Sequence, residues 1–564
     1  MASTPRVLIY ILRRDLRVRD NPILHEVSKL ASQSHRPFTH LLPIYVFSAN
    51  QIEISGFLAT GQAKSPYPEA RSPVGGFWRC GHHRAKFLAE ACWDVKDQLE
   101  KAGSGLQLRV GMVGDVVRDL LEKMGTEVGE VWMTSEEGVE EKREERSVKR
   151  AVEDAGLKFK LWKDEKYLID DDDIPFHNPK QLPDVFTEYR KMVEPLREAP
   201  RKVLPAPKTL LPLPAQIPPQ ASPFEMPTSL DSLIQALHKP LDPSLGLQNP
   251  PQMPKDGVQS AHPFTGGSTS GHARLIHLLA TGSMTKYKDT RNGLLGLDFS
   301  SKLSAWLALG CITAREVHSA LVAFEEGQLE ECKGAEGYGK GENKGTGWMR
   351  FELLWRDYMR LCTRKFGPRL FRASGFREDH QARWGYDKEK LRRWLEGTTG
   401  TGLVDASMRE LFLTGWTSNR ARQNVASYLS KHLGLDWRLG AEWYECALVD
   451  HDVSSNWGNW QYVAGVGNDP REGGGGRKFN PVKQADDYDP KGQYITAWIP
   501  QLRGMQPEDA FQCWKAGQDE KKRHELSGTE MAESPLVRIN YNVRRGGGGG
   551  RGRGGNRGRG NRGR

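Results

Sequence analysis

The chain has 564 residues, which is enough for two or three domains that each bury a core. Hydrophobic residues make up 37% of it and charged residues 27%, and no apolar run reaches membrane-spanning length, which excludes a membrane-embedded protein. The net charge of +10 comes mostly from residues 544–564, which hold eight arginines and no acidic residue and leave only about +2 for the other residues.

The seven cysteines are scattered and form no CxxC pair. The first residues, MASTPR, lack the apolar segment of a secretory signal. Both features indicate an intracellular protein with reduced thiols and no metal site. We expect it in the nucleus, the cytoplasm or both, and an organelle stays open as a further location.

Residues 1–165 alternate between short apolar runs and amphipathic stretches. The apolar runs, which we expect to be strands, are Val7–Leu12, Leu41–Phe47, Leu106–Val113, Val128–Thr134 and Phe159–Trp162. Segments such as Ala85–Lys101 and Asp115–Lys123 lie between them and predict helices. Strands that alternate with helices are typical of a parallel, Rossmann-like α/β domain.

Polar residues follow the first and the fourth predicted strands, where open α/β sheets bind ligands. The basic segment Arg13–Leu24 follows the first strand, and Asp20 or Asn21 within it is suited to cap a helix. Glu136 and Glu137 follow the fourth strand. No GxGxxG sequence follows the first strand, so an ordinary dinucleotide site is not expected in this domain.

Residues 166–263 are rich in proline. Sixteen of the 33 prolines lie between Pro195 and Pro263. Proline at this density excludes long helices and strands and favours an extended or irregular chain. We therefore expect a connector between two domains, ordered in part by packing against them.

The region 264–502 predicts an all-α domain. Within it, Ser300–Ser304 precedes a helical run. Hydroxyls and free N–H groups at a helix start, with one lysine, suit a phosphate, although most serine-rich helix starts are only caps. The sequence GYGKGENKGTG (337–347) has the wrong residue order for a phosphate-binding P-loop and predicts a flexible insertion.

The segment Trp348–Leu361 predicts a helix. Its residues Glu352, Trp355, Arg356 and Tyr358 are spaced so that several of them share one face. This face is a candidate binding surface, and the alternative is a core helix with one polar face.

Residues 414–480 are dense in tryptophan, asparagine, aspartate and arginine. Asp450 and Asp452 flank His451 in an otherwise apolar segment, and a buried carboxylate needs a partner. A planar polar cofactor would supply such a partner. The alternative is that the aromatic residues form a core, which is common for aromatics at helical spacing.

Three sequences in this stretch resemble the photolyase/cryptochrome family of flavoproteins, and most closely its DASH cryptochromes. They are TGWTSNRARQ (414–423), LVDHDVSSNWGNWQYVAGVGNDP (448–470) and RKFNP (477–481). The resemblance extends in order from about Val7 to Leu502. It implies an α/β antenna domain at 1–165, a connector at 166–263 and a helical FAD-binding catalytic domain at 264–502.

The resemblance implies that the helical domain binds FAD. The cofactor-binding residues it implies are Tyr287, Ser300, Ser301, Lys302, Leu303, Ser304, Arg356, Asn419, Arg422, Asp450, His451, Asp452 and Asn456. Arg422 is expected to pair with Asp450. Asn456 is expected to face the flavin N5, where an amide favours the fully reduced, electron-donating flavin. A methenyltetrahydrofolate antenna is also implied, with Glu137 as its candidate contact, and a solvated helix face is the alternative for that charged stretch.

The resemblance also implies roles in catalysis. Glu352, Asn419 and Asn456 are the implied catalytic residues, and Trp384, Trp437 and Trp460 the electron-transfer chain, with Trp460 nearest the flavin. The implied DNA contacts are Glu352, Trp355, Tyr358, Asn419, Arg420 and Tyr462. Three further tryptophans, Trp394, Trp443 and Trp457, are expected in the core.

Tyr462 stands where photolyases that act on double-stranded DNA have a second dimer-stacking tryptophan, and DASH proteins share this change. The resemblance therefore implies an enzyme that repairs cyclobutane pyrimidine dimers in single-stranded DNA under blue light, and we expect it to be a monomer. One alternative is a blue-light photoreceptor with little or no repair activity. Another is an RNA-binding protein that retains only the family's sequence pattern.

Residues 503–564 form a C-terminal extension. Its last part, Arg544–Arg564, contains only arginine, glycine and asparagine and predicts a disordered tail. Arg/Gly segments bind RNA or single-stranded DNA through charge and stacking. A solubilising or nuclear-targeting role is the alternative.

Overall fold

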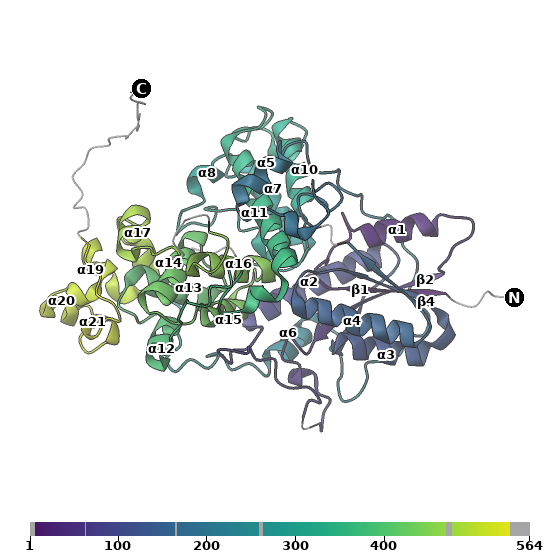
Figure 1. Cartoon of the computed structure of the whole chain (residues 1–564), viewed down its shortest axis with the longest axis horizontal. Coiled ribbons are helices and arrows are strands. Elements are labelled where there is room, and N and C mark those ends of the chain that lie inside the picture. Colours follow the sequence, from purple (N-terminus) through teal and green to yellow (C-terminus); the bar gives the residue numbers. More distant parts are fainter. Residues whose placement is uncertain (1–5, 63, 164–165, 259–262, 470–475, 542–564) are drawn as a thin grey trace.

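The computed structural model describes residues 6–62, 64–163, 166–258, 263–469 and 476–541. An α/β domain lies on one side of the molecule and a helical domain on the other (Figure 1). Within these residues no helix is both long and apolar enough to span a bilayer. The Arg/Gly-rich segment that was predicted to be disordered, residues 544–564, lies outside the described residues.

The α/β domain contains one sheet of five parallel strands in the order β3-β2-β1-β4-β5. The strands are β1 Val7–Leu12, β2 His40–Ser48, β3 Gln107–Gly111, β4 Val128–Thr134 and β5 Lys158–Trp162. They coincide with the predicted apolar runs to within two residues at every end. The parallel α/β prediction is therefore confirmed.

Helices cover both faces of this sheet. They are α1 Pro22–Ala31, α2 His82–Lys101, α3 Val113–Met124 and α4 Val139–Asp154. Because successive strand residues point to opposite faces, Val7, Ile9 and Ile11 pack with α3 and α4, whereas Leu8, Tyr10 and Leu12 pack with α1 and α2. Both faces of the central strands are thus apolar, as is usual for a parallel sheet. Of the two candidates for the cap of α1, Asn21 is the one whose side chain accepts from the Leu24 N–H.

The described residues of the predicted connector include the short α-helices α5 Phe186–Val193 and α6 Leu230–His238. Between them the chain lies extended along the α/β domain. The Gln220 side chain bonds both backbone groups of Val110, at the free edge of β3. These bonds hold this part of the chain against the α/β domain.

The helical domain is built from twelve α-helices in its described residues. They are α7 Ser268–Ala280, α8 Tyr287–Thr290, α9 Ser304–Ala308, α10 Ala314–Glu325, α11 Lys344–Phe366, α12 Lys388–Glu396, α13 Gly402–Thr414, α14 Asn419–Ser427, α15 Trp437–Ala447, α16 Val453–Ala464, α17 Pro481–Tyr488 and α18 Gln493–Trp498. A turn of π-helix, Tyr428–His432, continues α14.

The prediction of a flexible insertion at 337–347 is wrong for its second half. Asn343 caps α11, and its side chain accepts from the N–H groups of Gly345 and Thr346. A Cβ on Gly345 would lie 2.1 Å from the Met284 carbonyl oxygen, so the glycine allows close helix packing. Gly345 is therefore required for packing.

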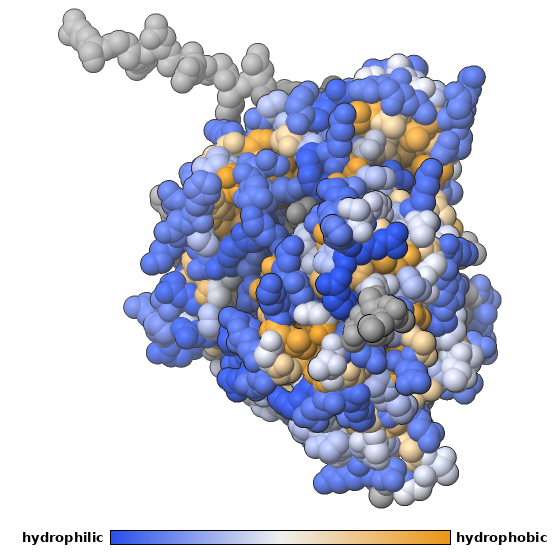
Figure 2. Space-filling model, turned by 90° about the vertical axis from the view of Figure 1, so that its right-hand side faces the viewer, coloured by the Kyte–Doolittle hydropathy of each residue, from blue (hydrophilic) through white to orange (hydrophobic). Residues whose placement is uncertain are grey.

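Two buried glutamates of α15 join the two domains. Glu445 pairs with Arg79 at 2.7 Å. Glu442 accepts hydrogen bonds from the Ser72 hydroxyl and from the N–H groups of Val74 and Gly75. The loop before α2 is thus fixed on the helical domain. Figure 2 shows the face on the α/β side, where hydrophilic residues cover most of the surface and apolar residues show between them.

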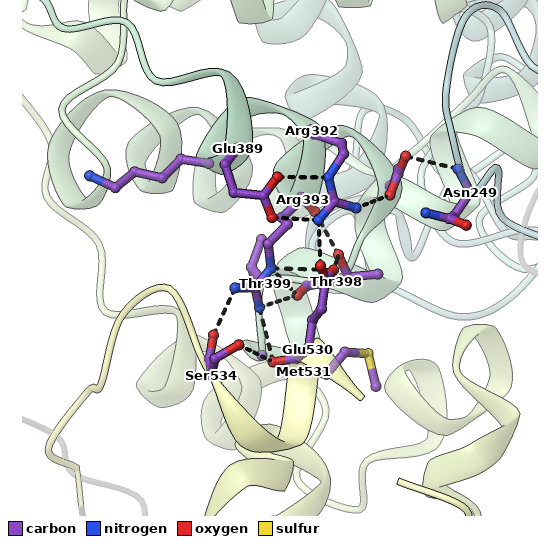
Figure 3. Close-up of polar contacts among 12 residues, drawn as sticks. Asn249, Glu389, Arg392, Arg393, Thr398, Thr399, Glu530, Met531 and Ser534 are labelled. Carbon is purple, nitrogen blue, oxygen red and sulfur yellow. Dashed lines mark hydrogen bonds and ion pairs between the residues drawn. The ribbon is translucent and has the colours of Figure 1, made fainter. Parts of the chain in front are cut away.

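The fold continues beyond residue 502 with α19 Pro507–Phe511, α20 Gln518–Arg523 and α21 Glu530–Glu533. Two arginines of α12 hold this segment, as Figure 3 shows. Arg393 donates to the carbonyls of Glu530 and Ser534, and Arg392 pairs with the Glu530 carboxylate. The segment up to residue 541 is therefore part of the folded molecule.

Candidate functional site

A cavity of about 450 Å³ opens in the helical domain between the loop before α9 and helices α11, α14 and α16. This volume is in the range of small-molecule and cofactor sites. The predicted site residues that line it are Tyr287, Ser300, Ser301, Lys302, Ser304, Glu352, Trp355, Arg356, Asn419, Arg422, Asp450, Asp452, Asn456, Trp460 and Tyr462. The fold therefore brings together residues that are up to about 175 positions apart in the sequence.

The carboxylate of Asp450 is held at the cavity wall by two partners. Arg422 donates to it at 2.8 Å, and the Ser304 hydroxyl donates at 2.6 Å. The Arg422–Asp450 pair that the sequence implied is present. Asp450 thereby connects the loop before α16 to α14 through Arg422 and to the start of α9 through Ser304.

Asp452 caps α16, since its side chain accepts from the Ser455 N–H at 2.9 Å. Arg356 of α11 donates to the other carboxylate oxygen at 3.2 Å. Burial alone would raise the pKa of this carboxyl, but Arg356 and the Ser455 N–H hold it at about 2. Asp452 is therefore an anion at neutral pH. Asn456, one turn further along α16, donates its amide to the Ala441 carbonyl at 2.9 Å.

The loop Ser300–Ser304 presents backbone N–H groups that donate no hydrogen bond to any of the described residues. Ser300 and Lys302 both have positive φ angles, 62° and 54°, which turn the backbone sharply at this point. The Leu303 side chain is fully buried and anchors the loop in the core. These free donors suit an anionic group.

The opposite part of the cavity is formed by α11. Glu352 pairs with Arg291, and partial burial raises the pKa of the Glu352 carboxyl although Arg291 acts in the other direction. Trp355 meets the ring of Tyr462 edge-on, with 5.8 Å between the ring centroids. Arg477 donates to the Tyr462 hydroxyl at 2.6 Å. An acid, an indole and a phenol ring thus face the same space as the two aspartates.

Four predicted cofactor or DNA residues lie outside the cavity lining. Tyr358 is only 1% exposed and donates to the Asp184 carbonyl, a placement that favours packing over contact with DNA. Arg420 is bonded to Asn292, Gln423 and Gln484. His451 points into a separate, smaller cavity, and Leu303 points into the core.

The three predicted electron-transfer tryptophans differ in their access to the cavity and to solvent. Trp460 lines the cavity and packs on Gly440, where a Cβ would come within 2.1 Å of the indole ring. Trp437 is buried one turn before that glycine on α15, and Trp384 is partly exposed. The indole N–H groups of Trp384 and Trp437 both donate to the Ala373 carbonyl, at 3.1 and 3.2 Å. Trp394, Trp443 and Trp457 are buried, which confirms their assignment to the core.

Glu137, the candidate folate contact, forms ion pairs in the structure. Arg364 of α11 donates to its carboxylate at 2.7 Å, and Arg360 lies 3.9 Å away. Both arginines also pair with Asp171 of the connector. The placement connects the α/β domain to α11, and the folate contact stays a prediction.

Several cavity residues received no role from the sequence. Arg291, Trp416, Tyr444 and Arg477 all line the cavity. Arg291 follows Tyr287 by four residues, which is one helical turn, and this spacing was the signal that could have found it. Arg477 belongs to the RKFNP sequence, but nothing in that sequence shows which side chain it approaches.

The cavity fits a flavin dinucleotide in its chemistry. The free N–H groups of Ser300–Ser304 suit a diphosphate, and charged and amide groups at the Asp450–Asn456 end suit the polar edge of a ring. The Tyr444 hydroxyl is buried in the lining and has no hydrogen-bond partner among the described residues. No cluster of three or more metal-ligating side chains occurs in the described part of the chain.

Comparisons with known proteins agree with this chemistry. Residues 8–208 match the family model "DNA photolyase", and residues 348–545 match "FAD binding domain of DNA photolyase". The chain is 50% identical to a cryptochrome DASH of Neurospora crassa, over 95% of this chain and 75% of the relative. It is 38% identical to cryptochrome DASH of Xenopus laevis, over 95% of this chain and 91% of the relative.

Solved structures show the same architecture. A cryptochrome of Synechocystis superposes with a TM-score of 0.75 at 33% identity, over 93% of this chain and 95% of that chain. A class III photolyase of Agrobacterium tumefaciens, at 23% identity, shares the fold with a TM-score of 0.69, over 95% of each chain. With its FAD-binding domain and these relatives, the chain belongs to the DASH cryptochromes of the photolyase/cryptochrome family of flavoproteins.

Proposed function

We propose that this protein uses blue light to repair cyclobutane pyrimidine dimers in single-stranded DNA. One observation carries the proposal: most of the residues implied for the cofactor and for the damaged base line a single cavity. Asp450, Asp452 and Asn456 lie at one part of it, and Glu352 and Trp355 at another. A dimer that enters would therefore come close to the cofactor without any rearrangement of the fold.

Bound and reduced FAD would supply the chemistry, because light excites it to donate an electron that splits the dimer and then returns. The protein would supply position and electrostatics. Trp355 would stack on a base, a contact that is worth about 1–3 kcal/mol. Glu352, which lines the same part of the cavity, would form a hydrogen bond with the base. Asn419, exposed at the start of α14, would add an amide contact.

The tryptophan path would keep the cofactor reduced. Trp384 is the member with access to solvent, and Trp460 is the member at the cavity, so electrons would enter at the first and arrive at the second. Trp437 links them through the carbonyl that it shares with Trp384.

Tyr462 supports the preference for single strands. A base must leave the helix of duplex DNA before it can enter the cavity, and this costs a few kcal/mol. A tyrosine stacks less strongly than a tryptophan and repays less of that cost, which is absent in a single strand. The bond from Arg477 fixes the Tyr462 ring further.

We propose further roles for the α/β domain and for the C-terminal segment. A methenyltetrahydrofolate antenna would lie near Glu137. Residues 544–564 would bind RNA or single-stranded DNA, and their deletion should weaken binding and flatten its salt dependence. The names of two relatives assign them to mitochondria, or to chloroplasts and mitochondria, which adds organelles to the nucleus and cytoplasm as locations. We propose that the protein acts as a monomer.

The first experiment measures dimer splitting by the purified, photoreduced full chain on single- and double-stranded oligonucleotides, in light and in darkness. We expect light-dependent splitting of the single strand, with little splitting of the duplex. Glu352→Ala should lower single-strand splitting at least tenfold, whereas the exposed Glu336→Ala serves as its matched control. An FAD-loaded, photoreducible protein that splits neither substrate would favour the photoreceptor function instead.

Tyr462→Trp tests the origin of the single-strand preference. The larger ring should raise splitting in the duplex several-fold while single-strand splitting changes little. If duplex splitting stays low although the single strand is repaired normally, the preference does not arise from Tyr462.

A further inference from the structure

The loop of residues 296–304, called the cavity loop below, has a backbone that needs support. Ser300 and Lys302 adopt φ angles of 62° and 54°. The left-handed region costs an L-residue with a Cβ about 1–2 kcal/mol, so something must hold each of them there. Two buried cations do so.

The first cation is Lys302 itself. Its ammonium donates to the carbonyl oxygens of Gly296, Leu297 and Phe299, at 2.8, 2.9 and 2.6 Å. All three ammonium protons are thereby used within the loop. The side chain is almost fully buried, and the indole ring of Trp416 lies 4.8 Å from the ammonium. A lysine that the sequence suggested for a phosphate therefore has its charge turned toward backbone carbonyls.

The second cation is Arg274 of α7. It donates to the carbonyls of Leu297 and Ser301, at 3.1 and 3.2 Å, and pairs with Asp298 at 2.7 Å. Together the two cations bind four carbonyls of the cavity loop. These carbonyls are thus occupied by cations of the protein, while no acceptor within the described residues takes the N–H groups of Ser300–Ser304, a loop that lines the cavity. A row of free N–H groups that faces a cavity is an anion-binding arrangement.

The charge of Lys302 has no counter-ion within 4.0 Å in the described part of the chain. Three charged groups act on it from the elements packed around it: Arg274 of α7, Asp298 of the cavity loop and Glu410 of α13. Burial, with a smaller contribution from Arg274, lowers the pKa of Lys302 to about 7. A bound anion would supply the missing negative charge.

We propose that Lys302 is a positioning residue for the diphosphate of FAD: its ammonium holds the carbonyls of the cavity loop and thereby turns the N–H groups of Ser300–Ser304 toward the phosphates. This inference rests on FAD being the occupant of the cavity. The diphosphate favours the protonated form of Lys302. At pH values above the pKa of Lys302 in the FAD-free protein, FAD binding is therefore coupled to the uptake of a proton by this lysine. Affinity is then highest below about pH 7 and falls above it, by at most about tenfold per pH unit for one linked proton.

The experiment measures the rate at which the full, FAD-loaded chain releases its flavin after dilution, through the rise in flavin fluorescence, from pH 6 to pH 9. Lys302→Met removes the charge and keeps the length of the side chain. Lys333→Met, at a lysine whose side chain is 76% exposed and far from the cavity lining in sequence and contacts, is the matched control. Thermal unfolding of each variant checks that it is folded.

We expect Lys302→Met to release FAD at least tenfold faster than the wild type at pH 6. The wild-type rate should rise with pH, whereas the rate of the variant should be nearly constant, so that the two converge at high pH. Should Lys302→Met not fold, Lys302→Gln gives the same comparison, and the wild-type profile is measured without any variant.

Wild-type release rates in Lys302→Met, or a wild-type rate that is flat from pH 6 to pH 9, would overturn the role of Lys302 and leave the proposed function intact. A wild-type chain that retains no FAD would instead refute the cofactor assignment on which the inference rests. The two failures are therefore distinguishable.

Discussion

Two polar regions of this molecule use the same residue types in different ways. One is the main cavity of the helical domain. The other, called the strand-end cluster here, surrounds the carboxyl ends of β1 and β4 and consists of Arg13, Arg14, Glu136, Glu141 and Glu144. Open α/β sheets usually bind ligands at such strand ends. Both regions therefore have residues that are suited to bind a ligand.

The charged groups of the strand-end cluster are paired with one another or with Lys166. Arg14 pairs with Glu141 at 2.9 Å, and Arg13 pairs with Glu144 at 3.3 Å. Lys166 neutralises Glu136 at 2.7 Å. The space left between these groups is only about 70 Å³.

In the main cavity, by contrast, a row of backbone N–H groups and the Tyr444 hydroxyl keep no protein partner among the described residues, and the space is about 450 Å³. Charged residues alone do not mark a ligand site. Groups left unsatisfied around a volume large enough for a ligand do.

The largest effect is expected from Asp452→Ala, in the main cavity. Removing this carboxylate leaves Arg356 as a buried charge without its carboxylate partner and removes the cap of α16. We expect retained FAD, measured as visible flavin absorbance per protein, to fall by about a hundredfold, equivalent to about 3 kcal/mol. Full retention of FAD in the folded variant would show that this end of the cavity does not hold the cofactor.

A smaller effect is expected from Trp437→Phe, which leaves the cavity lining intact. The variant loses the indole N–H that donates to the Ala373 carbonyl and the middle of the tryptophan path. Photoreduction of the flavin should slow about tenfold or more, while bound FAD stays constant. Trp443→Phe, at another buried tryptophan of α15, is the control and should photoreduce normally. Equal rates in both variants would rule out this path.

Glu445→Gln removes the buried ion pair with Arg79, which lies outside the cavity lining. We expect this pair to contribute only to the free energy of unfolding. Burial alone would raise the pKa of Glu445, but Arg79 and other cations lower it to about 2. A carboxyl with a depressed pKa in the folded state stabilises the fold above its unfolded pKa of about 4.5, and this stability is lost as the pH falls toward 2. The gain is about 3 kcal/mol.

The measurement is the free energy of unfolding of wild type and Glu445→Gln between pH 7 and pH 2. The two should differ most at pH 7 and converge in acid, with no change in FAD content at neutral pH. The exposed Glu389→Gln should follow the wild-type curve closely. A constant difference across the whole pH range would mean that the charge of Glu445 is not what stabilises the fold.

The smallest effect is expected from Glu137→Gln. Its ion pair with Arg364 is partly exposed, so its loss should cost only about 1 kcal/mol of stability. FAD content should be unchanged, and folate content, measured by extraction and chromatography, should fall several-fold if Glu137 is the antenna contact. Unchanged folate would leave Glu137 with the domain-bridging role that its ion pairs show.

Much of the fold was determined by the local sequence. Apolar runs bounded by turns specified the five strands, because a strand buried on both faces must be apolar throughout. Proline density specified the irregular connector, since proline removes a hydrogen-bond donor and fixes φ. The sequences around Asp450 and Asn419 led to the family, because they are long and ordered.

Tertiary structure decided which polar side chains are left for a ligand. Arg477 approaches the cavity from a segment with no recognisable spacing to it, whereas Tyr358 and His451, close to cavity residues in sequence, point elsewhere. Lys302 is the clearest case. The sequence has a lysine in a loop that was predicted to bind a phosphate, but in the fold its ammonium donates to carbonyls of the same loop. Direction and partner of a side chain depend on long-range packing, and no local pattern encodes them.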